Sequence, residues 1–411
     1  MIQGRSDLSL DALLDRSAPG WVQTLAALLA LPALLPLGLV FINALVWTRG
    51  RPLADAERAA PGGISVLIPA RDEVENIERC VRAAAAARGP VAEIIVYDDG
   101  STDGTTQVLA GLRADVPRLS VIAGEGLLPG WVGKPHALHR LSQAAHTDVL
   151  LHVDADVCLR HDGVLRMLSL LGTPDQVPGG LDAAAVTAVP RQRTGSFAER
   201  LMLPLLHLSY VAWLPMPLIH RTRDPRVLAA NGQLLLVRRA ALTAIGGWAS
   251  VRNELVDDMA VCRAIKRSGA RVVFADGDQM ADCRMYSDAA SLRRGFAKNF
   301  YEGIGGRPLA MVLVMALHLV LFVVPFIALP VAAGFGAWGL AAAAAVGVAA
   351  NLLLRMIMAV RYHHSLISVL LHPVAVVLMM GILFESFRWS RRGDIPWRGR
   401  SYGARVTRTA P

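Results

Sequence analysis

Cysteine and charge are both scarce in this sequence. Only four of its 411 residues are cysteine, which excludes a disulfide-stabilised scaffold and fits a reducing compartment. Charged residues make up 18% of the chain and hydrophobic residues 54%. This balance excludes an intrinsically disordered chain and argues against an ordinary soluble domain. The length leaves room for one large soluble domain together with membrane-spanning segments.

The positive charge is concentrated at the end of the chain. Residues 387–411 form an arginine-rich tail, which carries seven arginines against one aspartate and so +6 of the net charge of +9. An arginine-rich tail beside an apolar segment is typical of the positive-inside flank of a membrane protein. The basic balance therefore does not indicate a nucleic-acid-binding face, and we expect no nucleic-acid partner.

Uncharged stretches of membrane-spanning length lie at both ends of the sequence. Residues 21–48 are long enough for one helix across a bilayer. The preceding residues 1–20 contain three aspartates, which argues against a cleavable signal peptide. The uncharged stretch 308–354 would make a helix of roughly 70 Å, so we expect two spans with a break near residues 334–336.

A third C-terminal candidate covers residues 362–384, although it contains three histidines and a proline. We therefore expect two to three membrane segments within residues 308–386. Three crossings would place the basic tail opposite the soluble domain. Two crossings and one re-entrant or interfacial segment would keep the tail inside, as the positive-inside rule favours.

Residues 201–219 are also uncharged, but Pro204, Pro215 and Pro217 interrupt them. A crossing here would divide the soluble domain expected over residues 51–306 between the two sides of the membrane. We interpret this stretch as a membrane-surface segment. A buried pair of core helices explains the pattern equally well.

Short apolar runs alternate with helical spacing in the first part of the soluble domain. The runs fall at residues 64–68, 93–97, 119–123 and 149–153, with helical patterns between them. This rhythm predicts an α/β fold with a mainly parallel sheet and helices on both faces. Ligands of such sheets bind at the carboxyl ends of the strands.

Polar sequences follow each of the four predicted strands. They are PARDE at 69–73, DDGSTDGT at 98–105, GWVGKP at 130–135 and DAD at 154–156. Any one of them could be ordinary turn and helix-capping sequence. Because all four are expected at one edge of one sheet, together they favour a binding site.

Three charged side chains of this edge could together bind a diphosphate, two through a metal ion and one directly. Asp154 and Asp156 project to the same side of extended backbone and could hold Mg²⁺ or Mn²⁺. Lys134 adds a positive charge. For the Asp-x-Asp pattern alone, a solvated turn is the better explanation. A second acidic pair, Asp257 and Asp258, opens a helical run and fits helix capping, although Asp258 could act as a general base.

The motifs taken together resemble those of family 2 glycosyltransferases, which have the GT-A fold. The resemblance rests on PARDE, DDGSTDGT, GKPHAL, DAD and VDDMAVCRAIKRSG, and it covers about residues 63–305. The variants GWVGKPHAL and NGQLLLVRRAALTAIGGW and the ending WRGRSY are similar to those of membrane enzymes that glycosylate terpenoid lipids, such as the carotenoid- and hopanoid-associated enzymes.

This resemblance implies a role for each matching residue. The nucleotide-sugar site would comprise Pro69, Ala70, Glu73 near the ribose, the pair Asp98 and Asp99 at the base, with Asp99 as the residue that reads it, Lys134 at the diphosphate, and Asp154. Asp156, with Asp154, would bind the metal ion, and Asp258 would be the catalytic base. The resemblance also implies an inverting hexosyltransferase and a nucleotide-sugar donor, expected to be a UDP-sugar.

Two departures from the family pattern bear on the product. The usual Glu-Asp of the base motif is Asp257-Asp258 here. The Q-x-x-R-W motif of processive synthases is not recognisable; residues 292–300 stand in its place. We therefore expect one sugar to be added to a hydroxyl or carboxyl of a membrane lipid, terpenoid or otherwise. The alternatives are a processive polysaccharide synthase and a non-catalytic membrane scaffold.

Since nucleotide sugars are cytosolic, the domain should face the cytosol from a bacterial-type cytoplasmic membrane.

Overall fold

The computed structural model describes residues 20–402. Within it the chain forms two compact units, each built from separated stretches of sequence. The sheet unit comprises residues 46–195, 216–303 and 388–402, and the helical unit comprises residues 20–45, 196–215 and 304–387.

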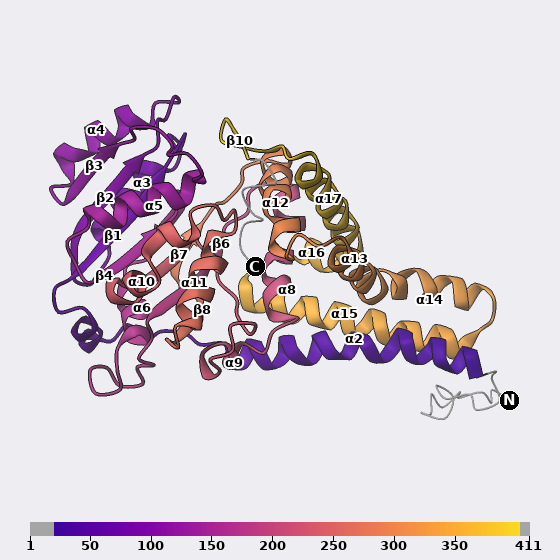
Figure 1. Ribbon diagram of the computed structural model, residues 1–411. Coiled ribbons are helices and arrows are strands. Elements are labelled where there is room, and N and C mark those ends of the chain that lie inside the picture. The colour runs from indigo at the N-terminus through magenta and orange to yellow at the C-terminus, as the bar shows by residue number, and fades with distance from the viewer. Residues whose placement is uncertain (1–19, 403–411) are drawn as a thin grey trace. The chain divides into compact units, whose positions relative to one another are not determined.

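The sheet unit is built on one eight-stranded sheet with the order β3-β2-β1-β4-β7-β6-β8-β5 (Figure 1). The strands are β1 (Ile64–Ala70), β2 (Val91–Asp98), β3 (Leu119–Ala123), β4 (Val149–Val153), β5 (Val157–Leu159), β6 (Ala185–Gln192), β7 (Leu234–Arg238) and β8 (Val272–Cys283). Strands β1 to β4 are parallel, whereas β7 runs antiparallel to both β4 and β6. The predicted mainly parallel α/β sheet is confirmed, and so are its first four strands.

Burial explains why these runs form strands. All five residues of β4 and the first five of β1 are buried, so side chains on both faces of the sheet are covered. Such strands have no polar face and read as continuous apolar runs. Helix α3 (Ile77–Ala86) shows the complementary pattern, because its buried residues Ile77, Cys80, Val81 and Ala84 recur at helical spacing.

Further helices of the sheet unit connect or flank these strands. They are α4 (Thr105–Asp115), α5 (Gly133–Ala144), α6 (Gly163–Leu171), α9 (Met216–Arg221), α10 (Arg239–Ala244), α11 (Asp257–Arg267) and α12 (Ala289–Gly303), with the 3₁₀ turns Ala54–Ala59 and Gly247–Val251. A C-terminal hairpin, β9 (Ile395–Trp397) and β10 (Arg400–Tyr402), also belongs to this unit.

The helical unit contains most of the apolar segments. Its helices are α2 (Gly20–Val46), α7 (Phe197–Met202), α8 (Pro204–Val211), α13 (Pro308–Phe322), α14 (Val324–Gly334), α15 (Trp338–Tyr362), α16 (Leu366–Leu370) and most of α17 (His372–Arg392). In the described part of the chain, α15 and α17 are each long and apolar enough to cross a membrane. Residues 201–219 form the end of α7, α8 and most of α9.

Candidate functional site

The carboxyl ends of β1, β2 and β4 lie at one edge of the sheet. Ala70 at the end of β1 pairs with Asp98 at the end of β2, and β1 also pairs with β4 in parallel. Pro69 and Ala70 are therefore part of this edge, and Ala70 is buried. β7 runs the opposite way, so the residues that precede it, Asn231 to Gln233, reach the same edge.

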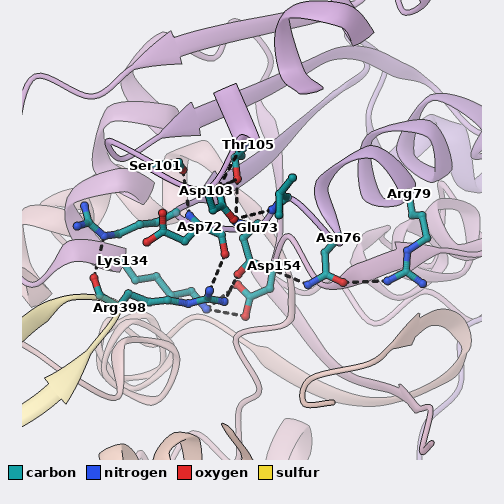
Figure 2. A network of polar contacts seen from close by, with 12 residues as sticks. Asp72, Glu73, Asn76, Arg79, Ser101, Asp103, Thr105, Lys134, Asp154 and Arg398 are labelled. Carbon is teal, nitrogen blue, oxygen red and sulfur yellow. Dashed lines mark hydrogen bonds and ion pairs between the residues drawn. The ribbon is translucent and has the colours of Figure 1, made fainter. Parts of the chain in front are cut away.

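The loops after β1 and β2 are joined by hydrogen bonds (Figure 2). The backbone N–H of Glu73 donates to Thr105 Oγ1 at 2.8 Å, and that of Val74 donates to Asp103 Oδ2 at 3.0 Å. In return, Thr102 N–H donates to Asp72 Oδ1 at 2.8 Å. These contacts fix the backbone at Glu73, whose side chain accepts a hydrogen bond from Asn76 at 2.9 Å.

Asp98 and Asp99 are adjacent and both buried, but they have different partners. Asp98 accepts hydrogen bonds from the backbone and hydroxyl of Ser101 at 3.0 and 2.6 Å, and from the Thr106 hydroxyl at 2.5 Å. Its carboxylate therefore holds the loop, as turn-forming aspartates do. The Asp99 carboxylate is paired with Arg400 instead.

Lys134 and Asp154 form an ion pair within the edge (Figure 2). Lys134 Nζ lies 2.6 and 2.9 Å from the two carboxylate oxygens of Asp154 and 3.4 Å from the carbonyl oxygen of Gly232. Burial alone would lower the pKa of Lys134, but Asp154, Asp257 and Asp258 together raise it. Lys134 thus remains a permanent cation among acidic groups.

Asp156 has an unsatisfied carboxylate oxygen. Its Oδ1 is buried without a hydrogen-bond partner. Burial, followed by the charges of Asp154 and Glu73, raises the pKa of Asp156 to about 7. An orphaned carboxylate oxygen next to a second carboxylate fits a divalent cation with oxygen ligands. Within residues 20–402, no three His, Cys, Asp or Glu side chains are grouped to hold a metal ion, so other ligands would come from a bound molecule or water.

The second acidic pair begins α11, as the sequence predicts, and Gly232 connects it to Lys134. Asp258 Oδ2 accepts a hydrogen bond from Gly232 N–H at 2.7 Å. A Cβ atom at position 232 would lie 3.1 Å from Asp258 Cβ and 3.2 Å from Lys134 Nζ. Asp257 Oδ2 is buried without a partner, and burial raises the pKa of Asp257 to about 6.

The C-terminal hairpin adds two arginines that the sequence did not assign to this site. Arg398 forms an ion pair with Glu73, and Arg400 forms one with Asp99 (Figure 2 shows Arg398). Tyr402 accepts a hydrogen bond from Gly133 N–H at 3.3 Å. The sequence interpretation counted both arginines as part of a membrane-flanking tail. The one available signal was the ending WRGRSY, which was noted only as a family variant.

Apolar packing fixes the hairpin where its arginines reach the site. Ile395 and Tyr402 form a small buried cluster with Val132 and Leu255, which flank the Gly133 and Asp257 segments. A Cβ at position 133 would lie 2.7 Å from Arg400 Nη1, so a larger residue there would displace the arginine from this position.

Lys298 of α12 is a further cation of this region. It is half-buried, and burial together with the charge of Lys134 lowers its pKa to about 8. Asp257 and Asp154 act on it in the opposite direction. The neighbouring Arg293 and Arg294 are exposed. Burial thus distinguishes Lys298 from the two exposed arginines, a difference that the sequence pattern does not show.

The comparisons with known proteins agree with this fold. The sequence profile described as "Glycosyltransferase like family 2" matches residues 61–298, more than half of the chain. A mannosyltransferase from Pyrobaculum calidifontis, solved with GDP-mannose and Mn²⁺, has a similar fold, with a TM-score of 0.54 at 17% identity. The match covers 90% of this chain and 98% of that one.

Two related sequences are named for different activities, one a polysaccharide synthase and one a glycosyltransferase acting on diaponeurosporenoate. The poly-β-1,6-N-acetyl-D-glucosamine synthase of Staphylococcus aureus is 23% identical over 54% of this chain and 50% of its own length, so the match spans about half of that relative. The 4,4′-diaponeurosporenoate glycosyltransferase of Staphylococcus haemolyticus is 21% identical over 68% of this chain and 73% of its own length. With a GT-A sheet and the family profile over its site, the chain belongs to glycosyltransferase family 2.

Proposed function

We propose that this chain transfers a single sugar, with inversion, from a UDP-sugar to a hydroxyl or carboxyl group of a membrane terpenoid or other lipid. The observation that carries the proposal is the grouping of Asp154, Asp156, Lys134 and Asp258 around Gly232 and the strand ends. This grouping offers a metal-binding carboxylate pair, a cation for a diphosphate and a base within one site.

The donor would lie along the edge formed by β1, β2 and β4. Pro69 and Ala70 would line the nucleotide site, Glu73 would contact the ribose, and Asp99 would accept a hydrogen bond from the base. Asp98 would act through the loop that it holds. Asp156 and Asp154 would hold Mg²⁺ or Mn²⁺, which would stabilise the negative charge of the departing diphosphate.

Asp258 would act as the general base. The acceptor oxygen attacks the anomeric carbon, the bond from that carbon to the diphosphate oxygen breaks, and the acceptor proton passes to the Asp258 carboxylate. The hydrogen bond from Gly232 N–H keeps this carboxylate oriented. A carboxylic acid acceptor would arrive already ionised and would not need the base.

The apolar helices would bring the enzyme to its acceptor. α15 and α17 are suited to anchor the chain in a membrane, where a lipid hydroxyl or carboxyl meets a water-soluble donor. Because nucleotide sugars are made in the cytosol, the sheet unit would face the cytosol from a bacterial-type cytoplasmic membrane. Residues 201–219 would lie at the membrane surface, close to the acceptor.

Processive synthesis is the second candidate, and the synthase relatives favour it. The unrecognisable Q-x-x-R-W motif and the carotenoid-type relative favour single transfer. A scaffold without activity would not need the carboxylates Asp156 and Asp258, and both are present.

Labelled sugar transfer distinguishes these functions. Membranes containing the protein are supplied with a panel of labelled nucleotide sugars, Mg²⁺ or Mn²⁺ and a total lipid extract, with Asp258→Asn membranes alongside. We expect label to enter the organic phase and the variant to lose it. Label in a water-soluble polymer would establish the synthase instead. No metal-dependent turnover with any donor would favour the scaffold.

A further inference from the structure

The helical unit contains a fully buried arginine. Arg355 of α15 has 0% exposure. Its Nη2 donates to the Ser368 hydroxyl at 3.0 Å and its Nη1 contacts the sulfur of Met358 at 3.8 Å, while its Nε has no partner. Among the described residues, no carboxylate forms an ion pair with it. A buried guanidinium without a counter-ion is costly in any protein interior and more so in a membrane.

Three histidines of the same helical unit come from α8, from the turn after α15 and from the start of α17. His207 of α8 is stacked on Tyr362 with ring centroids 4.5 Å apart, and its Nδ1 lies 3.2 Å from His364 Nε2. His372, at the start of α17, is buried with no partner for either ring nitrogen. Ser368, the residue that Arg355 contacts, lies four residues after His364 and four residues before His372.

A polar network in which the buried groups of the helix bundle bind only one another would be a simpler explanation for this cluster. It would require the buried donors and acceptors to satisfy one another, as they do in most native interiors. Here four buried atoms have no partner: Arg355 Nε, His364 Nδ1 and both ring nitrogens of His372. An anionic group with two or more oxygens would satisfy several of them and would balance the charge of Arg355.

We propose that Arg355, His364 and His372 form a binding site for the anionic oxygen group, carboxylate or phosphate, of a membrane lipid. Arg355 lies seven residues before the end of α15, about 10 Å along the helix axis. That depth suits a lipid whose polar group enters the protein while its chain stays in the bilayer.

Binding of labelled oleic acid to the full-length protein in detergent micelles tests the site. We expect saturable binding for the wild type and a loss of affinity of at least tenfold for Arg355→Gln. Arg355→Lys should retain most of the affinity, because it keeps the charge. Arg391→Gln is the matched control, since Arg391 is exposed. Manganese-dependent UDP binding, measured on the same preparations, reports whether each variant is folded.

If Arg355→Gln does not fold, His372→Leu is the second variant, and it should weaken oleate binding by severalfold. Oleyl alcohol, which lacks the charge, should compete at least tenfold more weakly than oleate. Equal binding by wild type and both variants, or equal competition by the alcohol, would overturn the proposal.

Competition by dioleoyl phosphatidic acid identifies the source of the anion. Stronger competition than by oleate would support the site and assign it to a phospholipid. Arg355-dependent binding of oleate without sugar transfer to any lipid would support the site and contradict the proposed function alone.

Discussion

Arg400 donates hydrogen bonds to both carboxylate oxygens of Asp99, at 2.5 and 3.0 Å, although 301 positions separate the two residues in sequence. The side chains are only 19% and 7% exposed. Two-point arginine–carboxylate pairs combine charge with fixed geometry. The residue proposed to recognise the nucleotide base is therefore oriented by the end of the described chain.

Replacing Arg400 should weaken both the fold and donor binding. In Arg400→Ala the buried Asp99 carboxylate loses its counter-ion, which should lower the free energy of unfolding by about 1–3 kcal/mol. The KM for the nucleotide sugar should rise about tenfold, a change of roughly 1.4 kcal/mol, with a smaller effect on kcat.

A double-mutant cycle with Asp99→Asn is the control for this pair. Once Asp99 is neutral, the Arg400→Ala change should cost clearly less stability in thermal unfolding. Additive effects of the two substitutions would show that the ion pair does not contribute.

Removing the proposed base should affect the chemical step. Asp258→Asn can still accept the hydrogen bond from Gly232 N–H, so donor binding should persist, while kcat for a hydroxyl acceptor should fall by about 10²–10⁴-fold. Asp257→Asn is the matched control, because it removes the neighbouring carboxylate of the same pair and leaves Asp258 with its hydrogen bond from Gly232 N–H. Equal losses in both variants would argue against a specific role for Asp258.

Removing divalent metal should abolish sugar transfer. We expect EDTA to stop the reaction and added Mg²⁺ or Mn²⁺ to restore it. Calorimetry should show that Asp156→Asn, which removes a charge from the orphaned carboxylate, loses metal-dependent donor binding. Transfer that continues at full rate in EDTA would rule out the metal role assigned to Asp154 and Asp156.

A single methyl group at position 232 should disturb the base and the cation together. In Gly232→Ala the new Cβ would lie 3.1 Å from Asp258 Cβ and 3.2 Å from Lys134 Nζ, so one of them must shift. We expect kcat to fall at least tenfold. Gly111→Ala, in an open position of α4, should leave kcat unchanged and stabilise the protein by up to about 1 kcal/mol. A fully active Gly232→Ala enzyme would contradict the proposed geometry.

The sequence predicted the sheet edge because buried parallel strands are visible as apolar runs, and polar residues follow them directly. The family resemblance favoured Asp99 over Asp98 as the residue that reads the base, but the sequence could not predict that Asp98 contacts Ser101 and Asp99 contacts Arg400. The hairpin was missed for the same reason. Arg398 and Arg400 lie more than 300 positions after the carboxylates that they contact, so the sequence showed them only as part of a basic tail, and only the tertiary fold shows their partners.

Arg355 shows another limit of reading charge along the chain. The uncharged stretch ends at Leu354, so the arginine marked the boundary of the predicted membrane segment. In the structure α15 continues to Tyr362, and Arg355 is buried inside the helical unit. A charge that ends an apolar run can therefore be an interior residue, which periodicity alone does not reveal.

The sheet unit is completed by residues 388–402, after the chain has passed through helices α13 to α17. Ile395 and Tyr402 complete a cluster begun by Val132 and Leu255, and Arg398 and Arg400 neutralise Glu73 and Asp99. Helices α13 to α17 are thus an insertion between two parts of one unit. A protein in which these helices were exchanged or shortened would therefore have to keep both junctions for residues 388–402 to rejoin the sheet unit.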